Sequence, residues 1–354
     1  MRQKQIEIKV IDMGKLTIKE IAGEAGVSVS TVSRVLNHPE IVSPEVCERV
    51  RNIIDEKGYT PNTFARSLKN KRSNIVGVIV TSLEVQFFAD IVNLLGSILN
   101  KNKIVMLVAS HNDDPVQEKS CLKAMMEMQV DAVLVATTNA NDKYLQSINN
   151  SGIPVILMDR SSRLPGFIAV HTDKEQGYYD LMQHLYNCGK RCFHLVTGDT
   201  NILTNYERFQ GCTRFVFDKK LSMDSLQCHY GDFTVKYGYS ACKEIVEANP
   251  ETPLAILAGS ANMAVGIYKY CLENNVSIPD KVAVTALGDF KNGFLIYPQL
   301  NYLDDMRDEL AQQMADVILD IIYKKKGSEQ VESADYLLHP SIIYGESSGK
   351  PKTL

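Results

Sequence analysis

Arg34 and Asn37 lie three residues apart in the segment AGVSVSTVSRVLN, which occupies residues 25–37. In a helix, that spacing brings two side chains to the same face. An arginine guanidinium can donate two parallel hydrogen bonds to a guanine edge, and the short side chains in this segment let a helix approach a duplex closely. These residue types indicate recognition of DNA. The sequence contains no Walker or HExxH motif that would indicate catalysis instead.

Two short helical patterns position this face. Thr17 and Glu20 have the spacing of a capping box, which predicts that a first helix begins at Ile18. Gly26 then supplies a tight turn before the second helix. Apolar residues recur at helical spacing in both patterns, as Ile18, Ile21, Ala22 and Ala25 and then as Val32, Val35 and Leu36. Outside the apolar face of the second helix lie Val29, Ser30, Ser33 and Arg34.

A third helix is predicted to begin at Ser43-Pro44-Glu45, where a capping residue precedes a proline in the first turn. Gly58 is a typical helix end. Its apolar residues are Val46, Val50, Ile53 and Ile54. Three one-sided helices of this size can form a single small core. The spacing alone leaves open an ordinary three-helix bundle with a charged surface.

The segment Gly58–Leu68 reads GYTPNTFARSL, and with the preceding block it resembles the lactose-repressor/galactose-repressor family of bacterial transcription regulators. The resemblance extends from Leu16 to about Ser348 and is most specific in the first 68 residues. It implies an effector-controlled, sequence-specific DNA-binding regulator. We expect no enzyme activity, cofactor or metal. It also implies a repressor that binds a pseudo-palindromic double-stranded DNA operator as a homodimer, with a tetramer as the alternative assembly.

The resemblance assigns DNA contacts to particular residues. Val29, Ser30 and Arg34 match positions that face base edges, and Arg34 is the principal base reader. Asn62 matches the cap of a short hinge helix, and Leu68 matches a residue that wedges into a base step of the minor groove. The alternative for Leu68 is a linker residue buried against the next domain. The full set of candidates is Thr17, Ser28, Val29, Ser30, Thr31, Ser33, Arg34, Asn37, Asn62, Ala65, Arg66 and Leu68.

Charge is distributed unevenly along the chain. Of its 38 Lys and Arg and 42 Asp and Glu residues, 13 and 9 fall in residues 1–73, which leaves 25 and 33 for the remainder. The first part therefore carries a net charge of +4 and the remainder −8. A basic head on an acidic body orients a protein with its head toward phosphate groups.

From Ile75 onward, apolar runs alternate with helical patterns, which predicts parallel sheets covered on both faces. About 280 residues are more than a single hydrophobic core usually accommodates, so two lobes are expected. The predicted strands are Ile75–Val80, Ile104–Val108, Ala132–Ala136, Pro154–Met158, Cys192–Val196, Ser225–Tyr230, Leu254–Ala258 and Val282–Leu287. The resemblance implies that the chain crosses between the lobes near Asp173, near Asn301-Tyr302 and once more before the C-terminus.

The expected fold is therefore a small all-α helix-turn-helix head and an α/β core of two periplasmic-binding-protein-like lobes with parallel sheets. The expected parts are an N-terminal tail (1–15), the helix-turn-helix domain (16–60), a hinge helix and linker (61–73), and an effector-binding and dimerisation core (74–348), in which the N-lobe comprises about 74–172 and 303–327 and the C-lobe about 173–300 and 330–348. Residues 1–12 are either a tail or lie upstream of the native start.

The resemblance places a small-molecule effector, a sugar or sugar derivative, outside the carboxyl ends of the strands. Arg208 matches an effector-clamping arginine, whereas Ala261 and Gly288 replace polar residues of the family, including a carboxylate in the case of Gly288. A cleft that loses this charge and keeps Arg208 favours a ligand with an anionic group. The effector-binding candidates are Phe87, Phe88, Asp159, Asp173, Asn205, Arg208 and Asp289.

Some of these residues have a structural alternative. Phe87 and Phe88 either stack on a sugar ring or base or pack in the core. Arg208 either pairs with an anionic group or forms a surface salt bridge. One cluster of potential metal ligands consists of His184, Cys188, Cys192 and His194. The spacing of these residues matches no standard zinc site, which favours packing roles for them.

The composition, with 45% hydrophobic residues and no apolar run of membrane-spanning length, predicts a soluble globular protein. The N-terminal segment lacks the apolar stretch of a signal peptide, and eight scattered cysteines fit reduced thiols, so we expect a cytoplasmic, nucleoid-associated protein. Two alternatives remain open. One is a regulator controlled by a protein corepressor, and the other is a cytoplasmic sugar-binding module or sugar-processing enzyme with an incidental head.

Overall fold

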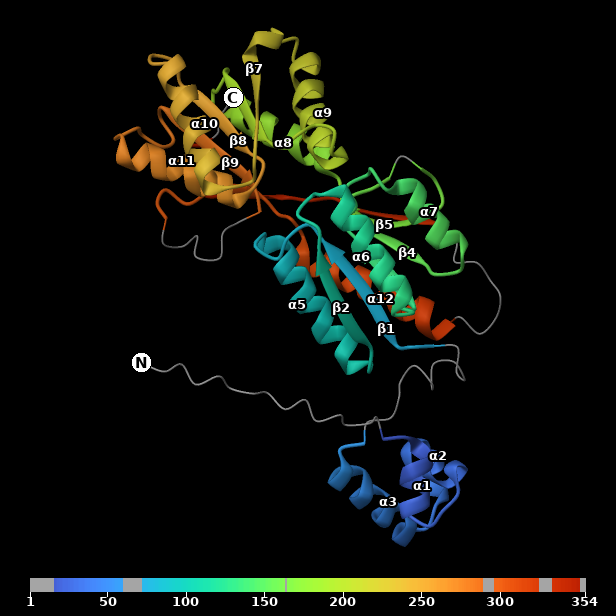
Figure 1. Ribbon diagram of the computed structural model, residues 1–354. Helices are drawn as coiled ribbons and strands as arrows, with labels where there is room; N and C mark the ends of the chain where they lie inside the picture. Colours follow the sequence, from blue (N-terminus) through green and yellow to red (C-terminus); the bar gives the residue numbers. More distant parts are fainter. Residues whose placement is uncertain (1–15, 60–71, 163, 289–295, 325–332, 351–354) are drawn as a thin grey trace, which may run out of the picture. The chain divides into compact units, whose positions relative to one another are not determined.

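The computed structural model describes residues 16–59, 72–162, 164–288, 296–324 and 333–350 (Figure 1). The chain divides into two compact units, residues 1–73 and residues 74–354. The predictions for the N-terminal tail and for Asn62, Ala65, Arg66, Leu68 and Asp289 lie outside the described residues.

The first unit contains a three-helix head. Its helices are α1 (Ile18–Glu24), α2 (Val29–Asn37) and α3 (Pro44–Lys57), with a short 3-10 turn at Pro39–Ile41. The apolar faces predicted from the sequence meet in one small core, whose most buried members are Ile21, Val32, Val35 and Val50. A core of this size leaves most of the head surface open to a partner.

The ends of these helices follow the local signals in the sequence. The Thr17 hydroxyl accepts a hydrogen bond from the Glu20 backbone N–H, and the Glu20 carboxylate accepts one from the Thr17 N–H, so the predicted capping box is present. Gly26 and Gly58 adopt left-handed conformations, with φ of +62° and +60°, where the chain turns. Ser43 precedes α3 as predicted, but its side chain makes no capping hydrogen bond.

The second unit contains two six-stranded sheets (Figure 1). The first sheet has the order β11-β5-β4-β3-β1-β2, and all its strands are parallel. Its strands are β1 (Ile75–Val80), β2 (Val105–Ser110), β3 (Ala132–Val135), β4 (Val155–Met158), β5 (Ile168–Thr172) and β11 (Ala334–Leu338). The helices packed with it are α5 (Gln86–Lys101), α6 (Pro115–Glu127), α7 (Asp142–Asn150) and α12 (Arg307–Lys324).

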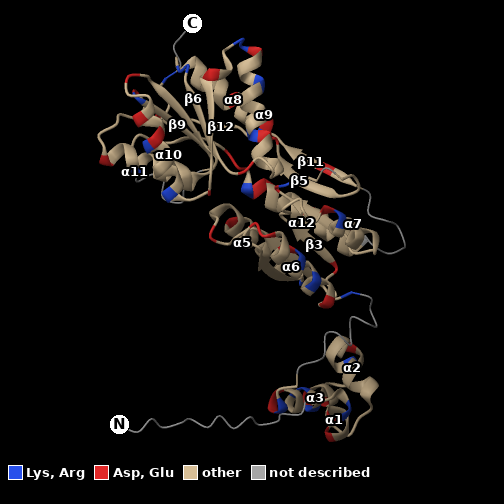
Figure 2. Ribbon diagram, turned by 45° about the horizontal axis from the view of Figure 1, so that its top comes forward, with Lys and Arg blue, Asp and Glu red and all other residues tan. Residues whose placement is uncertain are grey.

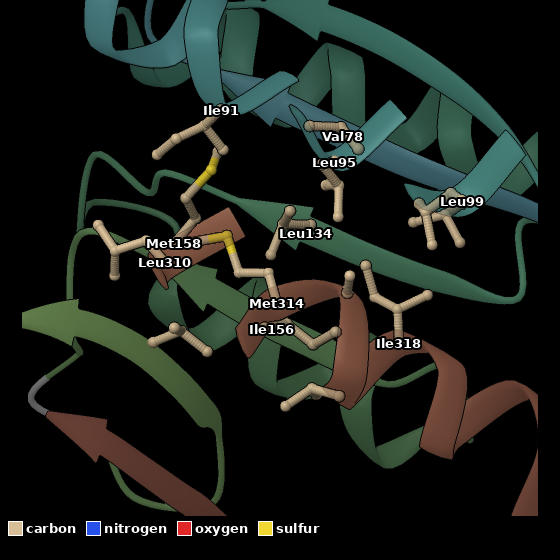
Figure 3. Packing of buried hydrophobic residues seen from close by; sticks show 14 of the residues in the cluster. Val78, Ile91, Leu95, Leu99, Leu134, Ile156, Met158, Leu310, Met314 and Ile318 are labelled. Atoms are coloured by element: carbon tan, nitrogen blue, oxygen red, sulfur yellow. The ribbon is translucent and has the colours of Figure 1, made fainter. Parts of the chain in front are cut away.

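The helices α5 and α12 cover one face of the first sheet, although they lie far apart in the sequence. Figure 3 shows their apolar side chains meeting over the middle strands of the sheet. The contacting residues that it labels are Ile91, Leu95 and Leu99 from α5, Leu310, Met314 and Ile318 from α12, and Val78, Leu134, Ile156 and Met158 from the strands. The start of α12 is therefore fixed against the first lobe.

The second sheet has the order β12-β10-β9-β8-β6-β7, in which only β12 runs antiparallel to its neighbour. Its strands are β6 (Phe193–Thr197), β7 (Leu226–Tyr230), β8 (Leu254–Ala258), β9 (Val282–Leu287), β10 (Asn301–Leu303) and β12 (Ile342–Ile343). Its helices are α8 (Lys174–Asn187), α9 (Leu203–Asp218), α10 (Val235–Ala248) and α11 (Ala261–Glu273), with a 3-10 turn at Met223–Ser225. Helices α8 and α9 pack on one face and α10 and α11 on the other.

The eight predicted strands are present, with ends that differ by at most two residues. The described part of the chain holds four further strands, β5, β10, β11 and β12, which were not predicted from the sequence. Strands β5 and β12 follow β4 and β11 without a helix between them, β10 has only three residues, and the middle three residues of β11 are exposed. The pattern used to predict the other eight therefore could not reveal them.

The chain passes between the two sheets three times: after Thr172, after Leu303 and after Leu338. Asn301 and Tyr302 belong to β10, so the second passage begins just beyond the expected point. Residues 330–348 were expected to belong wholly to the C-lobe, but β11 lies in the first sheet, where Tyr336 pairs with Val170. The reason is that β5 would otherwise leave an unpaired sheet edge.

The C-terminal segment is anchored in the second lobe by buried polar groups. The Ser347 hydroxyl donates to the Val284 carbonyl at 2.6 Å and accepts from the Asn301 N–H at 2.8 Å. Ser348 Oγ lies 2.7 Å from His184 Nε2. No helix in the described ranges is long and apolar enough to cross a membrane.

Candidate nucleic-acid interface and effector site

The residues predicted to face DNA lie on the solvent side of α2, because its apolar residues are turned into the head core. The exposed members are Ser28, Val29, Ser30, Arg34 and Asn37, and the half-buried members are Thr31 and Ser33. Val29 is an apolar residue with 41% of its surface exposed. The Arg34 side chain has no hydrogen-bond or ion-pair partner among the described residues. Its guanidinium can therefore bind an outside partner without breaking an internal contact.

Other polar residues of this face stabilise the helix itself. Ser28 Oγ accepts from the Thr31 N–H at 3.1 Å, which caps the helix, and lies 2.7 Å from Ser30 Oγ. Asn37 Nδ2 donates to the Ser33 carbonyl at 2.7 Å near the other end. These side chains have a structural role whether or not DNA is bound. The Arg34 side chain makes no such hydrogen bond with the helix. Arg34 is also the single charged residue of α2, whereas α3 carries charges of both signs (Figure 2).

In the core, the carboxyl ends of parallel strands of the second sheet meet at one edge. Thr197 ends β6, and Gly198 and Gly259 follow β6 and β8 directly. A Cβ added to Gly198 would lie 2.7 Å from Phe233 Cε2, and one added to Gly259 would lie 2.9 Å from Phe233 Cε1. The Phe233 ring therefore lies against the ends of these two strands, in space that the glycines leave open.

Arg208, on α9, contacts the same aromatic ring. Its Cζ lies 5.3 Å from the centroid of Phe233, and its Nη1 donates to Asn205 Oδ1 at 2.5 Å. Asn205 in turn donates to the Asp199 carbonyl at 2.8 Å. Arg208 is only 6% exposed, so it does not form the surface salt bridge of the alternative interpretation. Its Nε has no hydrogen-bond partner among the described residues.

Asp159 and Lys174 form a buried ion pair between the lobes. Asp159 follows β4 of the first sheet, Lys174 begins α8 of the second lobe, and Lys174 Nζ lies 2.8 Å from Asp159 Oδ1. The ammonium also donates to the Asp159 carbonyl and to Thr172 Oγ1, each at 3.1 Å. Burial raises the pKa of the Asp159 carboxyl, but the charges of Lys174 and then Arg208 bring it below the ordinary value. Asp159 is thus an ionised carboxylate whose charge is largely balanced.

Glu207 adds a second carboxyl beside this pair. Burial raises its pKa above the ordinary value, although Lys174 and other nearby cations act in the opposite direction. Its Oε2 is buried and unpaired among the described residues, as are Thr197 Oγ1 and Arg208 Nε. A buried polar atom without a partner costs roughly 1–3 kcal/mol. Thr197 ends β6 and Arg208 contacts the Phe233 ring beside that end, so their unpaired atoms indicate a place where a polar ligand would supply the missing partners.

The remaining predicted effector residues have more ordinary surroundings. Asp173 caps α8 by accepting from the Gln176 N–H at 2.9 Å, and its Oδ2 lies 3.4 Å from His339 Nδ1. Phe88 is 5% exposed and belongs to the core of the first lobe, and Phe87 packs against that core and against Phe88. Core packing therefore describes Phe88 better than stacking on a ligand.

Thr197, Lys174, Glu207 and Phe233 were not predicted from the sequence. Phe233 could have been found, because it follows a predicted strand more closely than Phe87 follows an earlier one. Lys174 and Glu207 gave no signal, since charged residues at the start of a helix pattern usually lie in solvent. Their burial results from the approach of the two lobes at the first crossing.

Gly288 was interpreted as a position where the site loses a carboxylate. Instead, a Cβ added to Gly288 would lie 2.6 Å from Asp305 Oδ2. Asp305 follows β10, the strand that pairs with β9, so a carboxylate reaches this place from the neighbouring strand. Spacing along one segment could not reveal it.

The four residues considered for a metal form two separate pairs. Cys188 Sγ lies 3.7 Å from His184 Nε2 beside the C-terminal segment, and Cys192 Sγ lies 3.4 Å from His194 Nε2. Burial, with the neighbouring His229, lowers the pKa of His194 to about 4, so this imidazole is neutral at pH 7. The described residues contain no group of three or more His, Cys, Asp or Glu arranged to hold a metal ion.

Comparison with protein families gives two matches. The family described as "Bacterial regulatory proteins, lacI family" matches residues 17–62. The family described as "Periplasmic binding proteins and sugar binding domain of LacI family" matches residues 73–340. The first match covers the head and the second covers most of the two-lobed core.

Individual proteins show the same likeness along nearly the whole chain. Catabolite control protein A of Staphylococcus xylosus is 27% identical over 286 residues, which cover 81% of this chain and 86% of that protein. The HTH-type transcriptional repressor PurR of Haemophilus influenzae (strain PittEE) is 26% identical over 333 residues, covering 94% and 98%. Among solved structures, the Lac repressor dimer bound to operator and the anti-inducer ONPF aligns with a TM-score of 0.79 at 20% identity, covering 94% and 99%.

Proposed function

Because the chain belongs to the lacI family of bacterial regulatory proteins, we propose that this DNA-binding transcriptional regulator is a repressor that acts as a homodimer on a pseudo-palindromic operator. The observation that most directly supports recognition of a specific DNA sequence is Arg34 on α2. Its side chain is exposed and has no hydrogen-bond or ion-pair partner among the described residues. In a dimer, two copies of α2 would enter successive major grooves about 34–36 Å apart. Such a function would place the protein in the cytoplasm, at the nucleoid.

We assign the DNA contacts by their chemistry. Arg34 reads a base edge, and Val29 gives apolar contact beside it. Ser28, Thr31, Ser33 and Asn37 hold the helix against phosphate groups, which sets register and adds salt dependence. The hinge residues Asn62, Ala65, Arg66 and Leu68 stay a prediction from the sequence, with Leu68 as the wedge that kinks the operator centre.

The effector is a sugar or sugar derivative bound where Thr197, Glu207, Arg208 and Phe233 meet. The supporting observation is the set of buried unpaired atoms on the first three of these residues. Hydroxyl groups can both donate to Glu207 and accept from Arg208, and a ring can lie against Phe233. An anionic substituent would gain a charge-assisted bond to Arg208. The site acts by binding and has no catalytic role.

Effector binding changes operator affinity by changing how the lobes are arranged. The Asp159–Lys174 pair joins the lobes at the first crossing, and both residues lie within electrostatic range of Glu207. A ligand that binds beside this pair stabilises one arrangement of the lobes over another. The two binding events are then coupled, so the effector must change DNA affinity as much as DNA changes effector affinity.

The test uses the full-length protein. Operator sequences are first selected from a random duplex library, and binding to the selected and a scrambled duplex is compared at several salt concentrations. Thermal unfolding is then followed with D-glucose, D-galactose, D-ribose, cellobiose, glucose 6-phosphate and ribose 5-phosphate, because a ligand present at 100 times its dissociation constant stabilises by about 2.7 kcal/mol.

The proposal expects a selected palindrome, steep salt dependence and at least one stabilising sugar that changes operator affinity. Stabilisation by a sugar without any preferred duplex would favour the cytoplasmic sugar-binding module. A preferred duplex without a stabilising sugar would refute the sugar effector and favour control by a protein corepressor.

A further inference from the structure

Arg208 is a buried cation that forms no ion pair among the described residues. Its hydrogen-bond partner there is the neutral side-chain amide of Asn205, and its Cζ lies over the Phe233 ring. A buried charge is normally paired with an opposite charge, because removing an ion from water is costly. No contact with a described carboxylate therefore balances the charge of Arg208.

The carboxylate of Asp159 lies within electrostatic range of Arg208, but Lys174 binds it. Lys174 Nζ lies 2.8 Å from Asp159 Oδ1, and the same ammonium donates to the Asp159 carbonyl and to Thr172 Oγ1, each at 3.1 Å. An ammonium has three N–H donors, so these contacts use all of them. The Lys174 side chain is 1% exposed. Lys174 therefore acts on a ligand through its charge and has no donor left for a direct hydrogen bond.

Other charged groups near Asp159 do not balance Arg208. Arg160 is paired with Asp113, at 2.7 Å between Nη1 and Oδ1. Glu207 forms no ion pair with Arg208, and burial raises the pKa of the Glu207 carboxyl, which favours its uncharged form. The pairing of Lys174 with Asp159 thus leaves Arg208 as a cation that an anion from outside the described residues can bind.

We infer that Lys174 is a specificity-determining residue of the effector site, because it balances Asp159 and leaves Arg208 available for an anionic group of the ligand. This inference rests on the proposed function and narrows the effector to sugar phosphates or sugar acids. Without Lys174, the charge of Asp159 would act against a ligand anion and would offset the attraction of Arg208. Lys174 acts through Asp159 and does not contact the ligand.

The experiment titrates the full-length protein with matched probes: D-glucose and glucose 6-phosphate, D-ribose and ribose 5-phosphate, and inorganic phosphate alone. The variants are Lys174→Met, Asp159→Asn and the double variant with both changes. Lys190→Met is the control, because Lys190 is also buried but donates to the Pro279 and Asp280 carbonyls and lies before β6, at the opposite end of that strand. Thermal unfolding without any probe shows whether each variant folds.

The wild type is expected to bind the phosphorylated member of a pair more tightly than the neutral member. Lys174→Met should weaken binding of the phosphorylated probe roughly ten- to a hundredfold and of the neutral probe by less than about threefold, since the change is one of charge. Asp159→Asn should shift the ratio of the two affinities in the opposite direction, and the double variant should return it close to the wild-type ratio. The control should keep the wild-type ratio.

Equal losses for both members of a pair in Lys174→Met, without recovery of the ratio in the double variant, would show a merely structural role and overturn the inference. If Lys174→Met does not fold, the same ratio in Asp159→Asn and in the wild type would overturn it. A wild type that prefers neutral sugars would also overturn it and would leave the sugar effector standing. Inorganic phosphate bound as tightly as the sugar phosphates would refute the sugar effector, and so would a wild type that binds no probe.

Discussion

Replacing Arg34 with alanine separates base reading from phosphate attraction. The exposed Arg34 side chain makes no hydrogen bond or ion pair with the described head residues, so Arg34→Ala should change the free energy of unfolding by no more than about 0.5 kcal/mol. A lost bidentate contact to guanine costs roughly 1–3 kcal/mol of specific binding. Because a dimer carries two heads, the operator complex should lose about 2–6 kcal/mol if the two losses add.

Fluorescence anisotropy at a fixed salt concentration measures the affinity of each variant for the selected operator and for a scrambled duplex. Arg51→Ala is the matched control, because Arg51 is exposed on α3 and lies outside the α2 face. We expect Arg34→Ala to lose affinity for the operator, to lose little for the scrambled duplex, and to relax the base preference at one position of each half-site. Equal losses on the two duplexes would show that Arg34 contacts phosphate, and base reading by this residue would be refuted.

Three further changes test other parts of the molecule. Leu68→Ala should weaken operator binding and reduce DNA bending in a gel-shift phasing assay while leaving the unfolding of the core unchanged; an early loss of the core would mean that Leu68 packs inside. Arg208→Lys should weaken binding of a phosphorylated sugar roughly 10- to 100-fold by isothermal titration, because two-point contact is lost, and should preserve operator binding without ligand; a neutral sugar bound equally tightly by both forms would contradict the anionic effector. Burial raises the pKa of the Glu207 carboxyl, so the folded protein binds a proton at Glu207 more tightly than the unfolded chain does. The free energy of unfolding therefore falls as the pH rises through the unfolded-state pKa and then the folded-state pKa of this group. Glu207→Gln should therefore melt at a higher temperature than the wild type at pH 7 and show no such gain at pH 4, and the same difference at both pH values would exclude ionisation as the cause.

Local signals in the sequence were sufficient for the head. The capping box at Thr17, the turn at Gly26 and the end of α3 at Gly58 each depend on a few neighbouring residues, and each is present. The eight main strands were predicted for a similar reason, since a buried parallel strand reads as a continuous apolar run. The edge strands β11 and β12 were not predicted; β11, for example, is held by its pairing with β5 rather than by its own composition.

The effector site was predicted only in part. Arg208 was found through its match to a family position and Asn205 was among the cleft candidates, and the structure brings both of them next to Phe233. Lys174 and Asp305 were not found, because their partners come from other strands and from the other lobe. The charge of a site that is formed by several strand ends depends on residues that are far apart in the sequence. An interpretation of one segment at a time misplaces that charge, as happened at Gly288.

The pairing of β5 with β11 makes folding of the first lobe depend on the order in which the chain leaves the ribosome. His171 Nε2 and Asp335 Oδ1 lie 2.6 Å apart although they are 164 positions apart in sequence. The first lobe therefore stays unfinished until almost the whole chain has emerged, whereas the described part of the head is complete within residues 16–59. A nascent or prematurely terminated chain would carry a finished head attached to a sheet with an open edge, which is a template for aggregation. Such fragments could occupy DNA without responding to any effector.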